Sequence, residues 1–143
     1  MTVRNWPDTP VAGDIAWCHF PDGVRPHPEP RPVLVLRVYG VQAPFAVRVA
    51  YGTSQRAPEL SDGEFAILKT DHPTAFALAN LSYATKFDLR QKVDLPYTTE
   101  WFSVPPHAPH GQAPKLGTLH TSLMRAAEAA HWAAVAKRHT RQP

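Results

Sequence analysis

The chain has 143 residues, 43% of them hydrophobic, and a formal net charge of +3 at pH 7 when its eight histidines are neutral. This length suits one domain with a core of its own, and a single cysteine, Cys18, excludes an internal disulfide. We find no signal-peptide pattern and no run of the roughly 20 apolar residues that a membrane span needs, so we expect a cytoplasmic protein. The mildly basic charge is compatible with a polyanionic partner but does not indicate one by itself.

The first regular element is expected at residues 13–20, GDIAWCHF. Successive side chains of a strand point to opposite faces, so Ile15 and Trp17 would share one face while Cys18 and Phe20 share the other. We expect this strand to lie in the core, and Cys18 to be a buried small hydrophobic residue rather than a nucleophile.

A proline-rich loop at residues 21–31 follows this strand. The next segment, 32–39, is apolar on both faces at its start, which favours a central strand of a small barrel. Residues 45–52 alternate cleanly between two faces, as a strand does. Further short segments separated by turn residues favour a β-barrel or sandwich. These segments are 64–68, 74–81, 84–97 and 100–104, of which 74–81 fits a strand or a helical turn equally well.

The C-terminal part of the chain differs from the rest. Residues 121–139 are rich in alanine and lack glycine and proline, which predicts a helix. Thr118 or Thr121 is the expected N-cap. Small side chains recur at helical spacing, so the helix should pack closely on the barrel or on a second copy of the chain. This stripe consists of Leu123, Ala127, Ala130 and Ala134.

These expectations describe a single domain that is mainly β. It comprises an N-terminal arm over residues 1–10, a small barrel over 11–104, a Pro-rich loop over 105–117 and a C-terminal helix over 118–139.

Polar residues stand at the ends of two expected strands. Arg31 comes directly before the apolar segment, and Thr53, Ser54 and Gln55 follow the next strand. Taken alone, such an arginine is usually a solvated charge or part of a surface ion pair. Hydroxyl residues at a strand end usually satisfy nearby backbone groups.

The order of these motifs resembles the MazF/PemK family of toxin–antitoxin ribonucleases. That family opens with a Gly-Asp-hydrophobic-x-Trp strand, continues with Arg-Pro before an apolar strand, and ends the next strand in a Thr-Thr/Ser-Gln-like run. The loop before the arginine departs from the family, because DGVRPHPEP replaces a Gly-Ser-Glu-Gln-like stretch. The matching residues are Gly13, Asp14, Trp17, Arg31, Pro32, Thr53, Ser54 and Gln55.

The resemblance implies a small SH3-like barrel of the MazF/PemK/CcdB type. It also implies a homodimer that cuts single-stranded RNA without a metal or cofactor and is neutralised by an antitoxin protein. The catalytic arginine and threonine become Arg31 and Thr53, with Ser54 and Gln55 lining the RNA groove. An arginine fork suits phosphate oxygens. A threonine hydroxyl can donate to a non-bridging oxygen or position the attacking 2′-hydroxyl.

Other residues are candidates for RNA contact. In the altered loop, Arg25 can contact a phosphate, and His27 or Glu29 can take a polar or proton-transfer role. Each can equally be an exposed loop residue. Lys86 and Arg90 can face RNA from a later strand, or protect a solvated sheet edge.

Aromatic and histidine side chains are the remaining candidates for ligand contacts. Single-stranded RNA stacks its bases on exposed aromatic rings, for which Tyr51, Trp101 and Phe102 are candidates. An HxxH spacing at residues 107–110, with His120 further on, can bind zinc if the loop folds back. We expect no metal site, because no helix presents the pair and no cysteine or carboxylate accompanies it.

Two other classes of function stay open. A non-catalytic barrel of the same superfamily would bind nucleic acid or inhibit a protein target, as the related CcdB toxin does with gyrase. The altered loop before Arg31 favours it. A structural or assembly subunit would use the helix at 118–139, but it leaves the placement of Arg31 and Thr53 unexplained.

Overall fold

The computed structural model describes residues 2–140, with side chains described as far as residue 136. Within that range the chain forms one sheet and a small number of helical segments. The strands are β1 (Asp14–Cys18), β2 (Arg31–Tyr39), β3 (Ala46–Thr53), β4 (Glu64–Ile67), β5 (Thr85–Pro96) and β6 (Lys115–Thr118). The helical segments are α1 (Pro73–Leu78), the 3-10 turn η1 (Thr121–Leu123) and α2 (Met124–Thr140).

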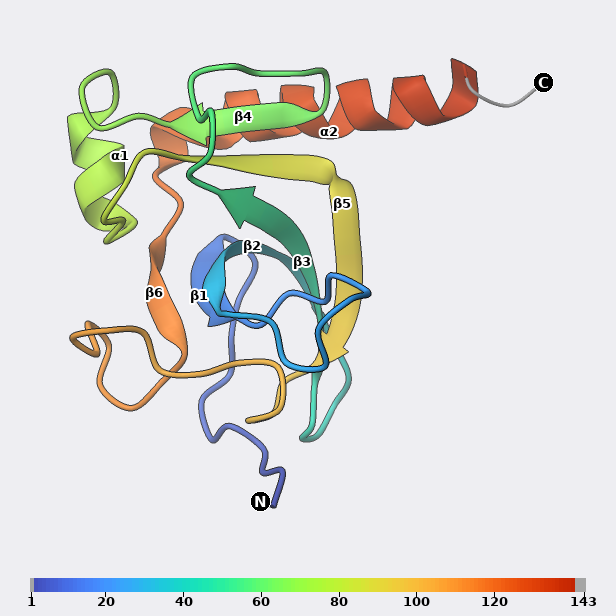
Figure 1. Cartoon of the computed structure of the whole chain (residues 1–143), viewed down its shortest axis with the longest axis vertical. Coiled ribbons are helices and arrows are strands. Elements are labelled where there is room, and N and C mark those ends of the chain that lie inside the picture. Colours follow the sequence, from blue (N-terminus) through green and yellow to red (C-terminus); the bar gives the residue numbers. More distant parts are fainter. Residues whose placement is uncertain (1, 141–143) are drawn as a thin grey trace.

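The sheet in the described part of the chain has six antiparallel strands in the order β4-β5-β3-β2-β1-β6. It curls into a half-barrel, and α2 runs beside β4 and β5 (Figure 1). The expectation of a mainly β chain with a C-terminal helix is therefore confirmed. The curled sheet is compatible with a small barrel.

Two apolar clusters cover the two faces of the sheet, and the alternation of β1 assigns its side chains between them. Ile15 and Trp17 pack in the cluster that also holds Leu123. Cys18 and Phe20 pack in the other cluster. The predicted division of faces is confirmed. Burial raises the pKa of the Cys18 thiol, which keeps it protonated and unreactive.

The strand β2 is central, as its sequence predicts, because β1 and β3 pair with its two edges. Leu34 packs in the cluster that holds Leu123, the first cluster, whereas Val33 and Val35 pack in the cluster that holds Cys18, the second cluster. All three side chains are at most 2% exposed. Apolar residues on both faces of this strand are thus explained by burial on both sides.

The helix α2 packs through its stripe of small residues. Leu123, Ala130 and Ala134 are buried, and Ala127 packs partly buried against the same cluster. The stripe is confirmed, and its neighbours are β4 and β5 of the same chain.

Several expected boundaries are wrong. The loop predicted at 105–117 runs into β6, which begins at Lys115 and pairs with β1. Thr118 ends that strand and cannot cap the helix. The cap is that of η1, which runs directly into α2: His120 Nδ1 accepts a hydrogen bond from the Ser122 backbone N–H at 3.0 Å. Residues 100–104 form only an isolated bridge to β1. For 74–81, where a strand and a helical turn were both open, the structure has a helix, α1.

The N-terminal arm is tied to the sheet rather than loose. Trp6 donates from Nε1 to the Phe102 carbonyl oxygen at 3.2 Å. The Tyr97 hydroxyl donates to Asp8 Oδ2 at 2.6 Å, and burial together with this carboxylate raises the pKa of Tyr97. Two aromatic side chains and a backbone bridge therefore hold the arm against the sheet.

Candidate functional site

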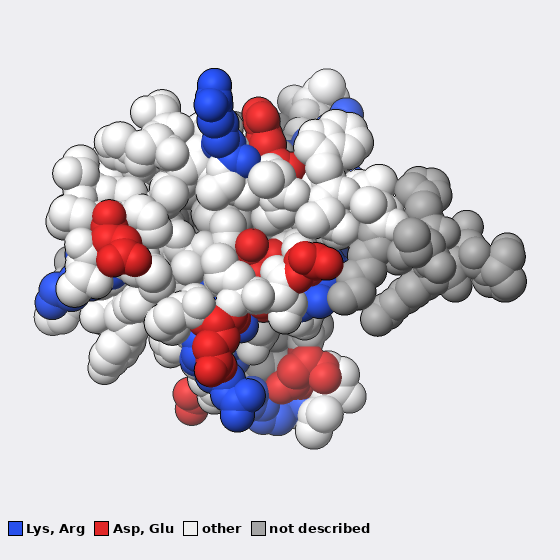
Figure 2. Space-filling view, turned by 90° about the horizontal axis from the view of Figure 1, so that it is seen from above, with Lys and Arg blue, Asp and Glu red and all other residues white. Residues whose placement is uncertain are grey.

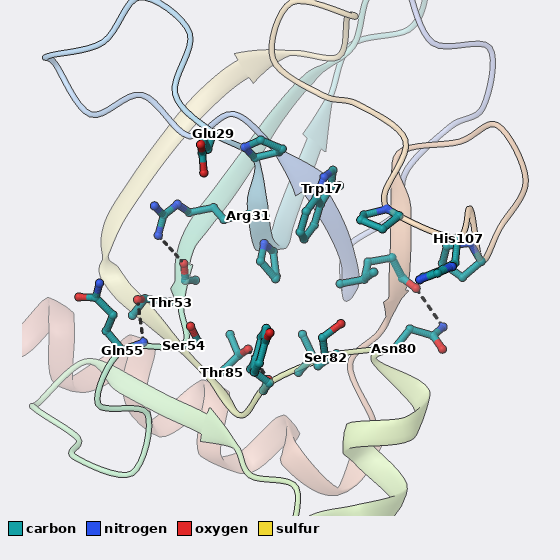
Figure 3. Close-up of a pocket in the computed structure, with 18 residues that line it drawn as sticks. Trp17, Glu29, Arg31, Thr53, Ser54, Gln55, Asn80, Ser82, Thr85 and His107 are labelled. Atoms are coloured by element: carbon teal, nitrogen blue, oxygen red, sulfur yellow. Dashed lines mark hydrogen bonds between the residues drawn. The ribbon is translucent and has the colours of Figure 1, made fainter.

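A cavity of about 670 Å³ opens where β2 begins and β3 ends. One wall is formed by the ends of these strands, and the opposite wall by the segment after α1 and the Pro-rich loop (Figure 3). The first wall carries polar side chains that the sequence singled out by their position at strand ends. They are Glu29, Arg31, Thr53, Ser54 and Gln55.

Arg31 and Thr53 are cross-strand neighbours. The pairing of β2 with β3 runs as far as Val33 opposite Tyr51, and Arg31 and Thr53 each stand two residues beyond this pair, at the ends of their strands. Side chains two residues apart on a strand point to the same face of the sheet. The hairpin geometry itself therefore brings a guanidinium and a hydroxyl to the same cavity.

Gly52 allows β2 and β3 to approach closely at this point. A Cβ atom at Gly52 would overlap the Pro32 carbonyl oxygen and lie 3.0 Å from Phe87 Cε1. Any side chain here would separate the two strand ends that carry Arg31 and Thr53.

The Arg31 guanidinium is oriented by Tyr51, and no carboxylate of the described residues pairs with it. Its Nη1 donates to the Tyr51 hydroxyl at 2.7 Å and to the Gly52 carbonyl oxygen at 3.3 Å. The guanidinium carbon lies 4.6 Å from the centroid of the Tyr51 ring. Among the described residues no carboxylate comes within ion-pair distance of Arg31. Because the group has five N–H donors, several remain for an anion in the cavity.

The hydroxyl of Thr53 is held by the turn that follows β3. Its Oγ1 accepts a hydrogen bond from the Gln55 backbone N–H at 3.1 Å. Accepting this bond fixes the side chain and leaves its proton to be donated. Thr53 can therefore act as a donor toward a group bound by Arg31.

The opposite wall was not anticipated. It includes Asn80 and Tyr83 from the segment after α1 and His107 from the Pro-rich loop, whereas Trp17, on β1 opposite Pro32 of β2, lies between the two walls (Figure 3). These residues come from remote segments, so no local pattern joins them. Two features of the sequence point to this wall: Tyr83, an isolated tyrosine in the polar stretch ANLSYAT, and His107, which the HxxH spacing suggested only as a zinc ligand.

Three predicted RNA contacts do not line this cavity. Arg25 pairs with Asp22 at 2.9 Å and lines a neighbouring hollow of about 340 Å³, which also includes Arg31. His27 stacks on the His19 ring, with centroids 3.9 Å apart. Lys86 is only 13% exposed because it forms an ion pair with a carboxylate of β4 at 3.2 Å.

Arg90 is likewise engaged by a carboxylate. It donates to the buried Asp88 through Nε at 2.9 Å and Nη2 at 3.0 Å. Burial alone would raise the pKa of Asp88, but the hydrogen bonds from Arg90 and Gln91 outweigh it, so the pKa is lowered. This arginine stabilises β5, and it is not available as a free phosphate contact.

The aromatic candidates for base stacking are placed differently from the prediction. Phe102 is fully buried and cannot meet a base. Trp101 packs partly buried against the second cluster. Tyr51 has its ring beneath the Arg31 guanidinium and its edge against Phe20. The rings that do line the cavity are those of Trp17 and Tyr83.

A buried histidine connects the altered loop to the rest of the fold. His19 is 8% exposed, and its Nδ1 lies 2.6 Å from the Pro28 carbonyl oxygen. Its Nε2 lies 3.1 Å from Ser103 Oγ. Burial lowers the pKa of His19, and the neighbouring His27 adds to this effect, whereas the contact with Pro28 opposes it. The loop that carries Glu29 is thus anchored through a neutral ring.

Charges elsewhere are dispersed. On the face seen from above, over β4 and α2, acidic and basic side chains are interspersed with wide uncharged areas (Figure 2). The net positive charge is therefore not gathered into a basic patch on this face. Among the described side chains, no three histidine, cysteine, aspartate or glutamate residues are grouped as metal ligands would be.

Comparison with models of known protein families finds no match. Comparison with curated proteins likewise finds no significant similarity. In the described part of the chain, no helix has the length and apolar character required to cross a membrane. The cavity and the residues that line it are therefore the features of the molecule that indicate a function.

Proposed function

We propose that this protein is a metal-independent endoribonuclease toxin that cleaves single-stranded RNA, with an SH3-like barrel of the MazF/PemK type. One observation carries the proposal. Arg31, which has no carboxylate partner among the described residues, lines one cavity together with Thr53 from the neighbouring strand end.

The two side chains supply what this cleavage requires. The 2′-oxygen of the substrate attacks the adjacent phosphorus, the bond from phosphorus to the 5′-oxygen breaks, and a 2′,3′-cyclic phosphate and a 5′-hydroxyl result. One proton leaves the 2′-hydroxyl and one reaches the departing 5′-oxygen. Arg31 stabilises the charge on the phosphoryl oxygens, and Thr53 donates to the same group. Glu29, which lines the cavity and is exposed, is the candidate to accept the 2′-proton.

The proposal includes two protein partners. A cognate antitoxin would cover the cavity and neutralise the enzyme, and a second copy of the chain would form a homodimer. Ser54 and Gln55 would contact the RNA beside the scissile phosphate, and Arg25 would contact a further phosphate from the adjoining hollow.

The experiment that tests the proposal is cleavage of a mixed-sequence single-stranded RNA in EDTA. Wild-type protein should cut it, and Arg31→Ala and Thr53→Ala should each reduce the rate by roughly a hundredfold or more, the usual effect of losing one preorganised donor. Arg56→Ala is the matched control, because Arg56 lies outside the cavity and is 83% exposed in its side chain. Equal rates for wild type and the two cavity variants would contradict the mechanism.

A second candidate is a non-catalytic barrel module that binds nucleic acid or inhibits a protein. One observation favours it: Arg31 already donates hydrogen bonds to Tyr51 and Gly52, which hold the guanidinium in one orientation suited to binding an anion. Under this alternative the protein binds RNA in an Arg31-dependent manner and leaves it intact.

A further inference from the structure

The wall across the cavity from Thr53 has no part in the proposed bond cleavage. Asn80 and His107 lie there, and Trp17 and Tyr83 line the same cavity (Figure 3). The cavity volume of about 670 Å³ falls within the roughly 300–1,000 Å³ typical of small-molecule sites and exceeds what one phosphate group needs. A second chemical group therefore fits beside the phosphate.

Two aromatic rings offer this group a stacking surface. Tyr83 is 72% exposed, although a large ring of this kind usually gains by burial. Trp17 packs on the first apolar cluster from one side and lines the cavity from the other. Every nucleobase has a π-face, so exposed rings beside a phosphate-binding arginine match an unpaired base.

Two polar side chains line the cavity together with these rings. Asn80 follows the C-cap of α1 with φ 53°, the left-handed conformation in which many helices end, and His107 has φ 66°, a value that few non-glycine residues adopt. Asn80 donates from Nδ2 to the Leu116 carbonyl oxygen at 2.9 Å, which fixes the amide and leaves its oxygen to accept from a ligand. The strained backbone of His107 is of the kind that gathers at ligand sites, where the surrounding fold holds it.

We propose that this wall is a nucleobase subsite. Tyr83 and Trp17 stack one unpaired base of the strand whose phosphate Arg31 binds, and Asn80 and His107 hydrogen-bond the edge of that base. The proposal rests on the proposed function for the nature of the ligand, single-stranded RNA, but does not depend on cleavage. All four side chains belong to one chain, so a single protomer holds the complete subsite.

The test uses strands that cannot be cleaved. Fluorescein-labelled 2′-O-methyl RNA octamers of each of the four bases are compared in fluorescence anisotropy with an abasic strand of equal charge. We expect wild-type protein to bind at least one base-containing strand about tenfold or more tighter than the abasic strand, as stacking energies imply. Tyr83→Ala should remove this difference without changing the affinity for the abasic strand, and Tyr83→Phe should preserve it.

The edge contacts are tested separately. His107→Ala should change the ranking of the four bases, whereas His110→Ala, in the same loop but outside the cavity, should leave it unchanged. Equal affinity for base-containing and abasic strands, or wild-type discrimination in Tyr83→Ala, would overturn the subsite. Base-dependent binding in a protein that cuts no RNA would support the subsite and contradict the cleavage proposal. Cleavage at a rate unaffected by Tyr83→Ala and by every change of base would support the cleavage proposal and contradict the subsite.

Discussion

The substitution Gly52→Ala tests whether the close approach of β2 and β3 sets the geometry of the cavity. The added Cβ would overlap the Pro32 carbonyl oxygen, at a distance well below the 3.0 Å that is the shortest contact Cβ atoms make. The Phe87 ring leaves it no space on the other side. The start of β2 must then move by about 1 Å, a displacement that typically costs roughly 10²-fold in rate when it misplaces a catalytic group. Overpacking of this kind also lowers the free energy of unfolding by about 1–3 kcal/mol.

The assay is single-turnover RNA cleavage, paired with urea unfolding of the same samples. Gly40→Ala is the matched control, because Gly40 lies in the turn at the far end of the same hairpin, with φ 108° and only ordinary contacts around a Cβ. Its backbone strain should lower stability by a comparable amount, about 1–3 kcal/mol, while leaving the rate unchanged. A Gly52→Ala enzyme that loses stability but cuts RNA at the wild-type rate would refute the reasoning.

Three further predictions concern stability. The pKa of His19 is lowered in the folded state, so its contribution to the free energy of unfolding is present above pH 6.5 and is lost as pH falls through the folded pKa. The free energy of unfolding of His19→Gln, measured by urea titration, should therefore fall less between pH 7 and pH 5 than that of wild type. Arg90→Ala should cost about 1–3 kcal/mol in the same measurement, because it leaves the Asp88 carboxylate buried without its two-pronged partner. Tyr97→Phe should loosen the N-terminal arm around Asp8, where the other contacts of the arm do not replace this hydrogen bond, seen as faster proteolysis near Asp8 with the remaining domain intact. An unchanged pH dependence, an unchanged urea midpoint or an unchanged digestion rate would contradict the respective prediction.

The central strands and one wall of the cavity are predictable because their determinants are local. Alternation in β1 and the apolar run of β2 report burial directly. The hairpin from β2 to β3 is short, so Arg31 and Thr53, at its open end, lie near one another once the strands pair. Their exact alignment is not local information, because a β-bulge between Val35 and Arg37 shifts the register by one residue between the turn and the open end.

The remaining features depend on contacts between distant segments. The strand β6 is four residues long, follows a proline-rich stretch and contains Gly117, so nothing in its own sequence marks it as a strand. That glycine is required because a Cβ there would overlap the backbone of Ala79 at the end of α1. The wall that carries Tyr83 and His107 forms only after this packing, and the partners of Lys86 and Arg90 are equally remote or buried. Sequence patterns report a residue's own burial but not which distant loop will face it.

The measurement that tests the central claim most directly is identification of the RNA ends by mass spectrometry after cleavage in EDTA. The account predicts fragments ending in a 2′,3′-cyclic phosphate and beginning with a 5′-hydroxyl, formed by wild-type protein and lost in Arg31→Ala and Thr53→Ala. A single 2′-deoxy nucleotide at a cut site should protect that site alone. Fragments with a 3′-hydroxyl and a 5′-phosphate, or RNA that stays intact with the wild-type protein, would contradict the claim that Arg31 and Thr53 act together on one phosphodiester.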